Sequence, residues 1–219
     1  GAHAGFATGW FVIASVEELP AGKVLPLSYF GKKLVAFRGE SGAVSVLDAH
    51  CPHLGAHMGY GGCVQGDSIV CPFHHWRWDA QGRLVEIPYA RRDRRPDVTL
   101  RRWPVHETCG VILVWNPATG AEPDWRMADA PEYFASGWSG YHTRTWRVRM
   151  HVQELAENVP DAPHFRYVHQ TPTLPTAVPS TAVPSTDGPI CRQETRMTSA
   201  DGKLDLTFRQ EAFGLGLIW

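Results

Sequence analysis

Residues 49–78 read AHCPHLGAHMGYGGCVQGDSIVCPFHHWRW, and this stretch decides both the fold and the chemistry of the chain. It contains two pairs of metal-ligand residues: Cys51 with His53 in C-x-H spacing, and Cys71 with His74 in C-x-x-H spacing. Cysteine sulfur and histidine nitrogen are ligands that zinc and iron share. The stretch therefore predicts a metal site supplied by two loops, each giving one thiolate and one imidazole.

Two kinds of site accept these four ligands. Zinc binds them in a closed tetrahedron, and its fingers more often pair the cysteines in one knuckle and the histidines in another. A Rieske-type [2Fe–2S] cluster places two cysteines on one iron and two histidines on the other. One Cys and one His in each loop, a proline directly after each cysteine and glycine-rich turns between the loops favour the cluster. A zinc-stabilised interaction module is the alternative.

The pattern CPHLGAHMGYGG…CPFHHWRW resembles the cluster-binding signature of Rieske proteins. This resemblance implies a [2Fe–2S] cluster held by Cys51, His53, Cys71 and His74. Respiratory members carry an extra cysteine in each loop, and these two form a disulfide. Ala56 and Phe73 occupy the matching positions here, which places the chain nearer the low-potential ferredoxins and oxygenases. The motifs CPHLGAH and CPFH-x-WRW are most similar to the 3-ketosteroid 9α-hydroxylase and cholesterol 7-desaturase branch.

Other residues of the stretch are expected to be neighbours of the cluster and not ligands. His50 and His57 are interpreted as surface or packing residues. His75 stands where the family most often has glycine, so it can shift the loop or add a hydrogen bond near the cluster. Trp76 and Trp78 either shield the cluster or belong to the core.

A second constellation follows in residues 157–169, ENVPDAPHFRYVH. His164 and His169, with Asp161 before them, can converge on one metal if the stretch is a helix kinked near Pro160. Taken alone, the pair could be ordinary histidines of an amphipathic stretch. It resembles, however, the N-x-x-D-x-x-H-x-x-x-x-H segment of Rieske non-haem iron oxygenases.

That resemblance implies that His164 and His169 bind a mononuclear Fe(II). It also implies that Asp161 bridges a Rieske histidine of a neighbouring subunit to an iron histidine, within a homotrimer. The third ligand of the family is an Asp or Glu nearer the C-terminus, and none of the acidic residues after His169 fits its pattern. We therefore expect the third ligand beyond Trp219, in a chain truncated within its second domain.

The chain is expected to be α+β, with two domains. Residues 8–118 show β-branched and aromatic runs separated by turn residues, which predict an all-β Rieske domain. Residues 119–219 are expected to be the first part of a helix-grip catalytic domain with an antiparallel sheet. Within it, 171–188 is predicted to be a flexible Pro/Ser/Thr-rich loop without elements, and two strands are expected around the turn ADGK at 200–203.

Composition limits the remaining classes. A net charge of -1 gives no support to nucleic-acid binding, and no apolar run suits a membrane span. The basic strip 91–102 could dock an acidic ferredoxin or reductase, or be a solvated face. Five cysteines without a disulfide-framework pattern, and no secretory signal at the N-terminus, favour a cytoplasmic protein.

Together these features predict a terminal oxygenase. An NAD(P)H-dependent reductase or ferredoxin would supply electrons to the cluster, and the iron would use them with O2 to oxidise an apolar substrate, such as a steroid or sterol. The alternative is a Rieske ferredoxin-like electron carrier without catalytic iron, although a carrier needs only about half of this length.

Overall fold

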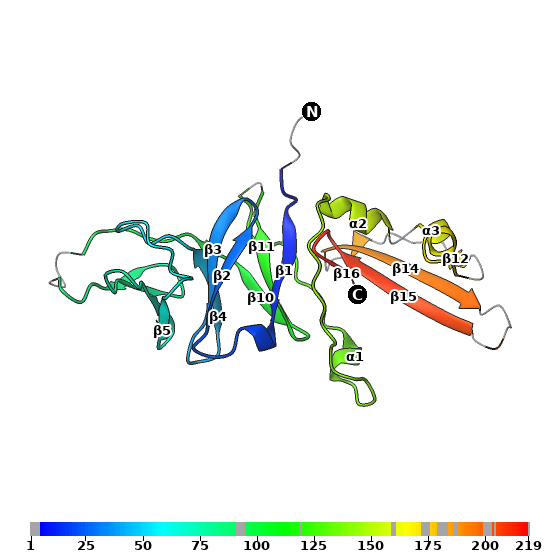
Figure 1. Ribbon diagram of the computed structural model, residues 1–219, viewed down its shortest axis with the longest axis horizontal. Helices are drawn as coiled ribbons and strands as arrows, with labels where there is room; N and C mark the ends of the chain where they lie inside the picture. The colour runs from blue at the N-terminus through cyan, green and yellow to red at the C-terminus, as the bar shows by residue number, and fades with distance from the viewer. Residues whose placement is uncertain are drawn as a thin grey trace. The chain divides into compact units, whose positions relative to one another are not determined.

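A computed structural model of the chain (Figure 1) divides into two compact units. Unit 1 comprises Gly1–Thr8 and Val12–Pro123, and unit 2 comprises Gly9–Phe11 and Asp124–Trp219. The structure describes residues 5–90, 95–118, 120–158, 161–171, 176–178, 184–185, 188–198, 203 and 205–218.

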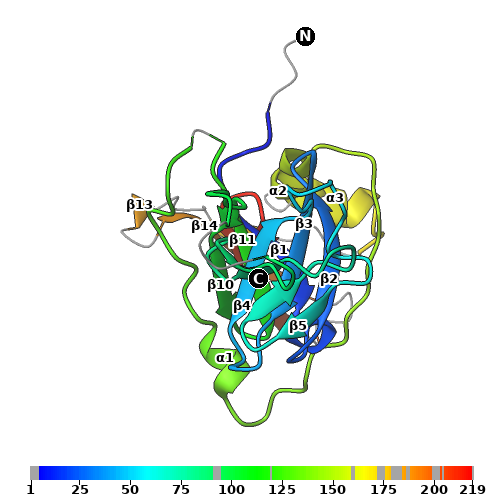
Figure 2. The same cartoon turned by 90° about the vertical axis from the view of Figure 1, so that its left-hand side faces the viewer.

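Three sheets carry unit 1, in the strand orders β1-β11-β10, β2-β3-β4-β9 and β5-β6-β7-β8. The elements are β1 (Gly9–Ser15), the 3-10 helix η1 (Val16–Glu18), β2 (Val24–Tyr29), β3 (Lys32–Arg38), β4 (Val44–Asp48), β5 (Cys63–Gln65), β6 (Ser68–Val70), β7 (Arg77–Asp79), β8 (Leu84–Glu86), β9 (Arg102–Trp103), β10 (Val105–Thr108) and β11 (Val111–Asn116). Figure 2 shows β2, β3 and β4 side by side.

The central sheet β2-β3-β4-β9 separates two cores, and the two-residue period of a strand explains why. In β3, Leu34 and Ala36 pack in one core with Ile112 and Val114 of β11. The intervening residues Val35 and Phe37 face the opposite core, which contains both cluster cysteines. A strand that is buried on both faces has a continuous run of apolar residues, and KLVAFR comes close to such a run.

The hairpin between β2 and β3 is a two-residue turn. Tyr29 pairs with Lys32, and both intervening residues, Phe30 and Gly31, have positive φ (52° and 67°). Two left-handed residues define a type I′ turn, whose twist matches that of the strands. This hairpin helps to fix the register of the sheet from which the first ligand loop leaves.

Unit 2 combines three short helices with one sheet of the order β12-β14-β15-β16, and β13 pairs with β14. Its elements are α1 (Pro131–Phe134), α2 (Val152–Asn158), α3 (Ala162–Tyr167), β12 (Thr176–Val178), β13 (Pro184–Ser185), β14 (Gly188–Thr198), β15 (Asp205–Phe213) and β16 (Leu217–Ile218). The expected helical character on both sides of Pro160, which itself lies outside the described residues, is confirmed by α2 and α3. The expected pair of C-terminal strands is confirmed by β14 and β15, which pair antiparallel from Ile190↔Phe213 to Thr198↔Asp205.

Two expectations for unit 2 are wrong in part. Within the segment 171–188, which was expected to contain no elements, β12 and β13 are strands because β14 offers them an edge to pair with. Proline has no backbone N–H, and Pro184 is tolerated there because not every N–H of an edge strand donates a hydrogen bond within the sheet. The rest of that segment after Thr171 lies outside the described residues.

The second difference concerns residues 141–150, whose partial alternation of apolar and polar residues is typical of a strand. They form neither strand nor helix, because no described strand pairs with them. Trp146 is 74% exposed as a result.

The α+β class, with antiparallel sheets and few helices, is confirmed. Among the described residues, no helix is long and apolar enough to span a membrane. The cluster stretch lies on unit 1: its first loop connects β4 to β5, and its second connects β6 to β7.

Candidate metal centres

The first ligand loop, residues 51–56, is a turn closed by two backbone hydrogen bonds around its cysteine. The Cys51 N–H donates to the Ala56 carbonyl (2.9 Å), and the Gly55 N–H donates to the Cys51 carbonyl (2.8 Å). Gly55 has φ +76°, a conformation that glycine adopts without steric cost. The turn therefore holds His53 at its outer end.

The second ligand loop, residues 71–76, repeats this design. The Cys71 N–H donates to the Trp76 carbonyl (2.9 Å), and the His75 N–H donates to the Cys71 carbonyl (3.1 Å). His75 takes φ +58° and is thus the counterpart of Gly55 in the first loop. This position explains why glycine is usual there: the turn needs a left-handed residue, and His75 supplies one with its side chain exposed to solvent.

The two loops bring the four predicted ligands together in like pairs. Cys51 and Cys71 are buried free thiols, 1% and 2% exposed, and their side chains share a hydrogen bond. The rings of His53 and His74 meet edge to face, with centroids 4.6 Å apart. The sulfurs therefore lie on the core side of the site, and the half-buried imidazoles lie towards the surface.

The chemistry of these donors fits a metal centre. Nδ1 of His74 is buried and has no hydrogen-bond partner among the described residues, a costly state for a polar atom unless a metal binds it. Burial raises the pKa of the Cys51 thiol, as does nearby Cys71, while the backbone of His53 and the side chain of Trp78 oppose that rise. A bound cation reverses such a shift because it deprotonates its thiol ligands.

The pairing of like ligands, Cys51 with Cys71 and His53 with His74, also bears on the choice between zinc and the cluster. A zinc site would need four such ligands around a single point. Each iron of a [2Fe–2S] cluster needs only two protein ligands, because bridging sulfides supply the others. The arrangement therefore favours the cluster.

Aromatic side chains support the imidazole side of the site. Trp76 stacks on His53 with centroids 4.3 Å apart and ring planes within 8° of parallel. Its indole N–H donates to the hydroxyl of Tyr89 (2.7 Å). Since both contacts restrain the Trp76 ring, they also restrain the ring of His53. The sequence left open whether Trp76 and Trp78 are core residues or neighbours of the cluster. In the structure both tryptophans belong to the core that also contains the two cluster cysteines.

His50 and His57 hold the first ligand loop from outside. Nδ1 of His50 lies 2.9 Å from the Gly55 carbonyl, and the Gly59 N–H donates to Nδ1 of His57 (3.1 Å). The two rings contact each other with centroids 5.1 Å apart. Burial lowers the pKa of His57, and the charges of His50 and Lys33 lower it further.

In unit 2, α3 brings its two candidate iron ligands together. The rings of His164 and His169 lie with centroids 5.1 Å apart, one within the helix and one just after its end. Nδ1 of His164 hydrogen bonds to the backbone carbonyl of Asp161, the N-cap residue. The Asp161 side chain is exposed and does not cap the helix.

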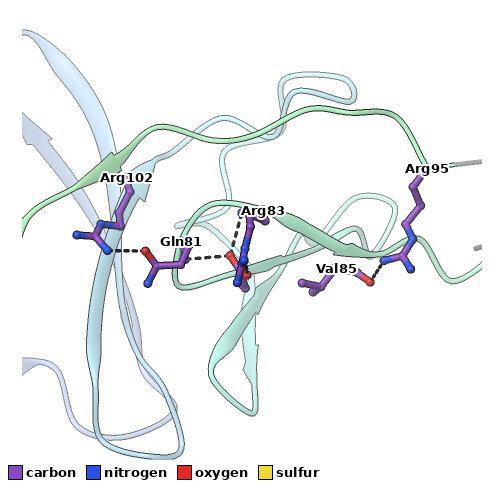
Figure 3. A network of polar contacts seen from close by, with 6 residues as sticks. Gln81, Arg83, Val85, Arg95 and Arg102 are labelled. Carbon is purple, nitrogen blue, oxygen red and sulfur yellow. Dashed lines mark hydrogen bonds and ion pairs between the residues drawn. The ribbon is translucent and has the colours of Figure 1, made fainter.

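The described part of the basic strip contacts the turn after β7 and strand β8 (Figure 3). Arg83, which lies outside the strip, pairs with Asp79 at 2.7 Å across that turn. From the strip, Arg102 donates to Gln81 and Arg95 donates to the Val85 carbonyl. Residues 91–94 of the strip lie outside the described residues. These contacts fasten the segment after residue 95 to the cluster-bearing sheet.

Comparisons with known proteins agree with this arrangement. Residues 9–104 match the Rieske [2Fe-2S] domain family, and residues 114–217 match the 3-ketosteroid 9alpha-hydroxylase C-terminal domain family. A cholesterol 7-desaturase from Bombyx mori is 42% identical over 170 residues, which cover 77% of this chain and 37% of the relative. A probable 3-ketosteroid-9-alpha-monooxygenase oxygenase component from Rhodococcus rhodochrous is 40% identical, over 75% of this chain and 41% of the relative.

Among solved structures, a crystal structure of dicamba monooxygenase aligns with a TM-score of 0.71. It is 24% identical, and the alignment covers 95% of this chain and 64% of that one, so the likeness concerns the fold. The chain spans about two fifths of the length of the curated relatives it matches.

Proposed function

We propose that this chain, which belongs to the Rieske non-haem iron oxygenases, forms part of a terminal oxygenase that passes electrons from its [2Fe–2S] cluster to a mononuclear iron. One observation carries the proposal: a complete two-Cys, two-His site is followed on the same chain by the facing rings of His164 and His169. A simple electron carrier has no use for the second pair. We place the boundary between the two functional domains at residues 118 and 119.

The cluster site is arranged for exchange of electrons at a protein surface. Its cysteines are buried, whereas its histidines lie towards solvent. Leu54 and Phe73, next to the two histidines in the chain, are 65% and 60% exposed. An exposed apolar rim around a polar centre is typical of a surface that docks another protein. Electrons therefore enter and leave on the imidazole side.

The histidine pair is arranged to bind Fe(II). The Asp161 carbonyl engages Nδ1 of His164, which leaves Nε2 of that ring available to a metal. Two imidazoles and one carboxylate on one face of iron keep the opposite positions open, and such iron supplies electrons singly to dioxygen. We assign to the exposed Asp161 the link to a neighbouring subunit's cluster in a homotrimer.

The substrate and partners follow from the relatives. The names of two relatives refer to cholesterol and to 3-ketosteroids, so the substrate proposed here is an apolar steroid or sterol. The electron donor is an NAD(P)H-dependent reductase or a ferredoxin. The five cysteines are free thiols, which supports a reducing cytoplasmic setting.

Counting iron and sulfide tests the proposal. Reconstituted protein should hold two irons and two sulfides with the visible spectrum of a histidine-ligated cluster, and it should bind a third iron through His164 and His169. Because the chain covers only part of its relatives, the count is repeated on the complete protein, together with oxygen-dependent turnover of a ketosteroid. A complete protein that stays at two irons supports the carrier instead, and a colourless zinc protein refutes both.

A further inference from the structure

Trp78 differs from other buried tryptophans of unit 1 in the hydrogen bonding of its indole N–H. It is fully buried, yet its Nε1–H has no hydrogen-bond acceptor among the described residues. By contrast, the indoles of Trp76, Trp103 and Trp115 each donate to an oxygen at 2.7–2.9 Å. A buried N–H without an acceptor destabilises the folded protein, so such a group requires an explanation.

The explanation lies in what the indole faces. Trp78 is the middle residue of β7, the strand that follows the second ligand loop, and its side chain points into the core that contains Cys51 and Cys71. The sulfurs of Cys51 and Cys71 are thus acceptors available in the core that Trp78 enters, and a thiolate accepts a hydrogen bond far better than a thiol does. An effect of the Trp78 side chain that lowers the pKa of the Cys51 thiol, against the larger opposite effect of burial, supports Cys51 as the acceptor.

We propose that the indole N–H of Trp78 donates a hydrogen bond to the Cys51 sulfur of the [2Fe–2S] cluster and raises the reduction potential of that cluster. The physical reason is charge. The reduced cluster carries one more negative charge than the oxidised cluster, so a donor to its sulfur stabilises the reduced form more. This inference rests on the cluster of the proposed function and does not depend on the oxygenase chemistry.

The test is a redox titration of the cluster-loaded chain carrying Trp78→Phe, which keeps an aromatic ring and removes the N–H. We expect the ratio of reduced to oxidised cluster at the wild-type midpoint to fall about tenfold, which is about 59 mV for a one-electron couple. Trp103→Phe is the matched control. Trp103 is also buried, but its N–H donates to Asp48 (2.8 Å), so the potential should not change.

The inference is overturned if Trp78→Phe keeps the wild-type potential, or if both variants lower the potential equally, which would indicate a general packing effect. Should Trp78→Phe fail to load a cluster, the unaltered protein decides. Pulsed EPR of its reduced cluster, with ¹⁵N in the indole rings, should show an exchangeable proton on an indole nitrogen coupled to the cluster, and absence of that coupling would contradict the hydrogen bond. A chain that holds no cluster at all refutes the proposed function at an earlier step, and so the two failures are distinguishable.

Discussion

The cluster site and the histidine pair of α3 differ in how many donors the described chain brings together. The cluster site receives four donors from two matching loops, which short strands and a buried core hold in place. The pair His164 and His169 sits on a six-residue helix with exposed surroundings and, among the described residues, has no carboxylate beside it to complete a metal site. All four donors of the first site therefore come from unit 1, whereas the described part of unit 2 brings two donors together at the second.

The largest expected effect is loss of the cluster in Cys71→Ser. Cys71 is buried, and its sulfur is one of only two protein ligands assigned to its iron. We expect iron and sulfide to fall to background, and the free energy of unfolding of unit 1 to fall by several kcal/mol, because metal binding couples to folding. Iron and sulfide analysis and chemical unfolding provide the measurements.

Cys63→Ser is the control for that experiment, because Cys63 is an exposed free thiol on the same small sheet. It should keep the full cluster. If Cys71→Ser retained the cluster's spectrum and iron content, the ligand assignment of the second loop would be wrong.

The next effect concerns the histidine pair. In the complete protein, His164→Ala or His169→Ala should weaken Fe(II) binding by about 100-fold or more, since each removes a direct ligand. The cluster's absorption should remain, because the two sites share no residues. Competition with an Fe(II) chelator measures the affinity. His142→Ala, at another exposed histidine of unit 2, should bind iron normally; equal losses in all three variants would argue against a specific site.

The two ligand loops themselves allow a finer comparison, since Gly55 and His75 hold the same left-handed position. A Cβ at Gly55 would meet no atom within 4 Å, so any cost of Gly55→Ala comes from the backbone alone. We expect that variant to lower the free energy of unfolding by about 1 kcal/mol, and His75→Gly to raise it by about half as much, because histidine tolerates this region better than alanine. Denaturant unfolding of the cluster-loaded protein measures both values. Changes of the same sign in the two variants would show that the loops are not equivalent.

Much of this arrangement could be predicted from local patterns. The spacing of Cys51, His53, Cys71 and His74 was sufficient to assign the ligands and to pair the loops. The β-branched and aromatic residues of KLVAFR predicted a strand, and the prolines near 160 separated two helices. The proposed iron ligands His164 and His169 needed the resemblance as well, because two histidines alone are ambiguous.

Features that depend on distant partners could not be predicted in this way. The strands β12 and β13 exist because β14, further along the chain, offers an edge to each of them. Conversely, 141–150 has the alternation of a strand but no described partner. Trp78 of β7 and Cys51 of the first ligand loop share one buried core, although 26 residues separate them in the chain, so no spacing rule signals their proximity. For His75, the departure from glycine was visible, but its left-handed backbone was not.

The smallest expected effect is a pH dependence of the first ligand loop. The pKa of His57 lies below the ordinary histidine value of 6.5, mainly through burial and also through the charges of His50 and Lys33. As the pH falls, His57 therefore binds a proton near pH 6.5 in the unfolded chain, but only at a lower pH in the folded protein. As the pH falls below that value, protonation favours the unfolded state, and the free energy of unfolding decreases. Above pH 7 this contribution to stability is fully present.

His57→Asn tests this linkage, because asparagine can still accept a hydrogen bond from Gly59 but does not titrate. The loss of stability between pH 7.5 and pH 5.5, measured by urea unfolding, should be smaller in the variant than in the wild type. His142→Asn, at an exposed histidine of unit 2, should leave that loss unchanged. An identical loss in wild type and His57→Asn would assign the acid sensitivity of unit 1 to other groups, and would leave His57 as a packing residue that holds the first ligand loop without sensing pH.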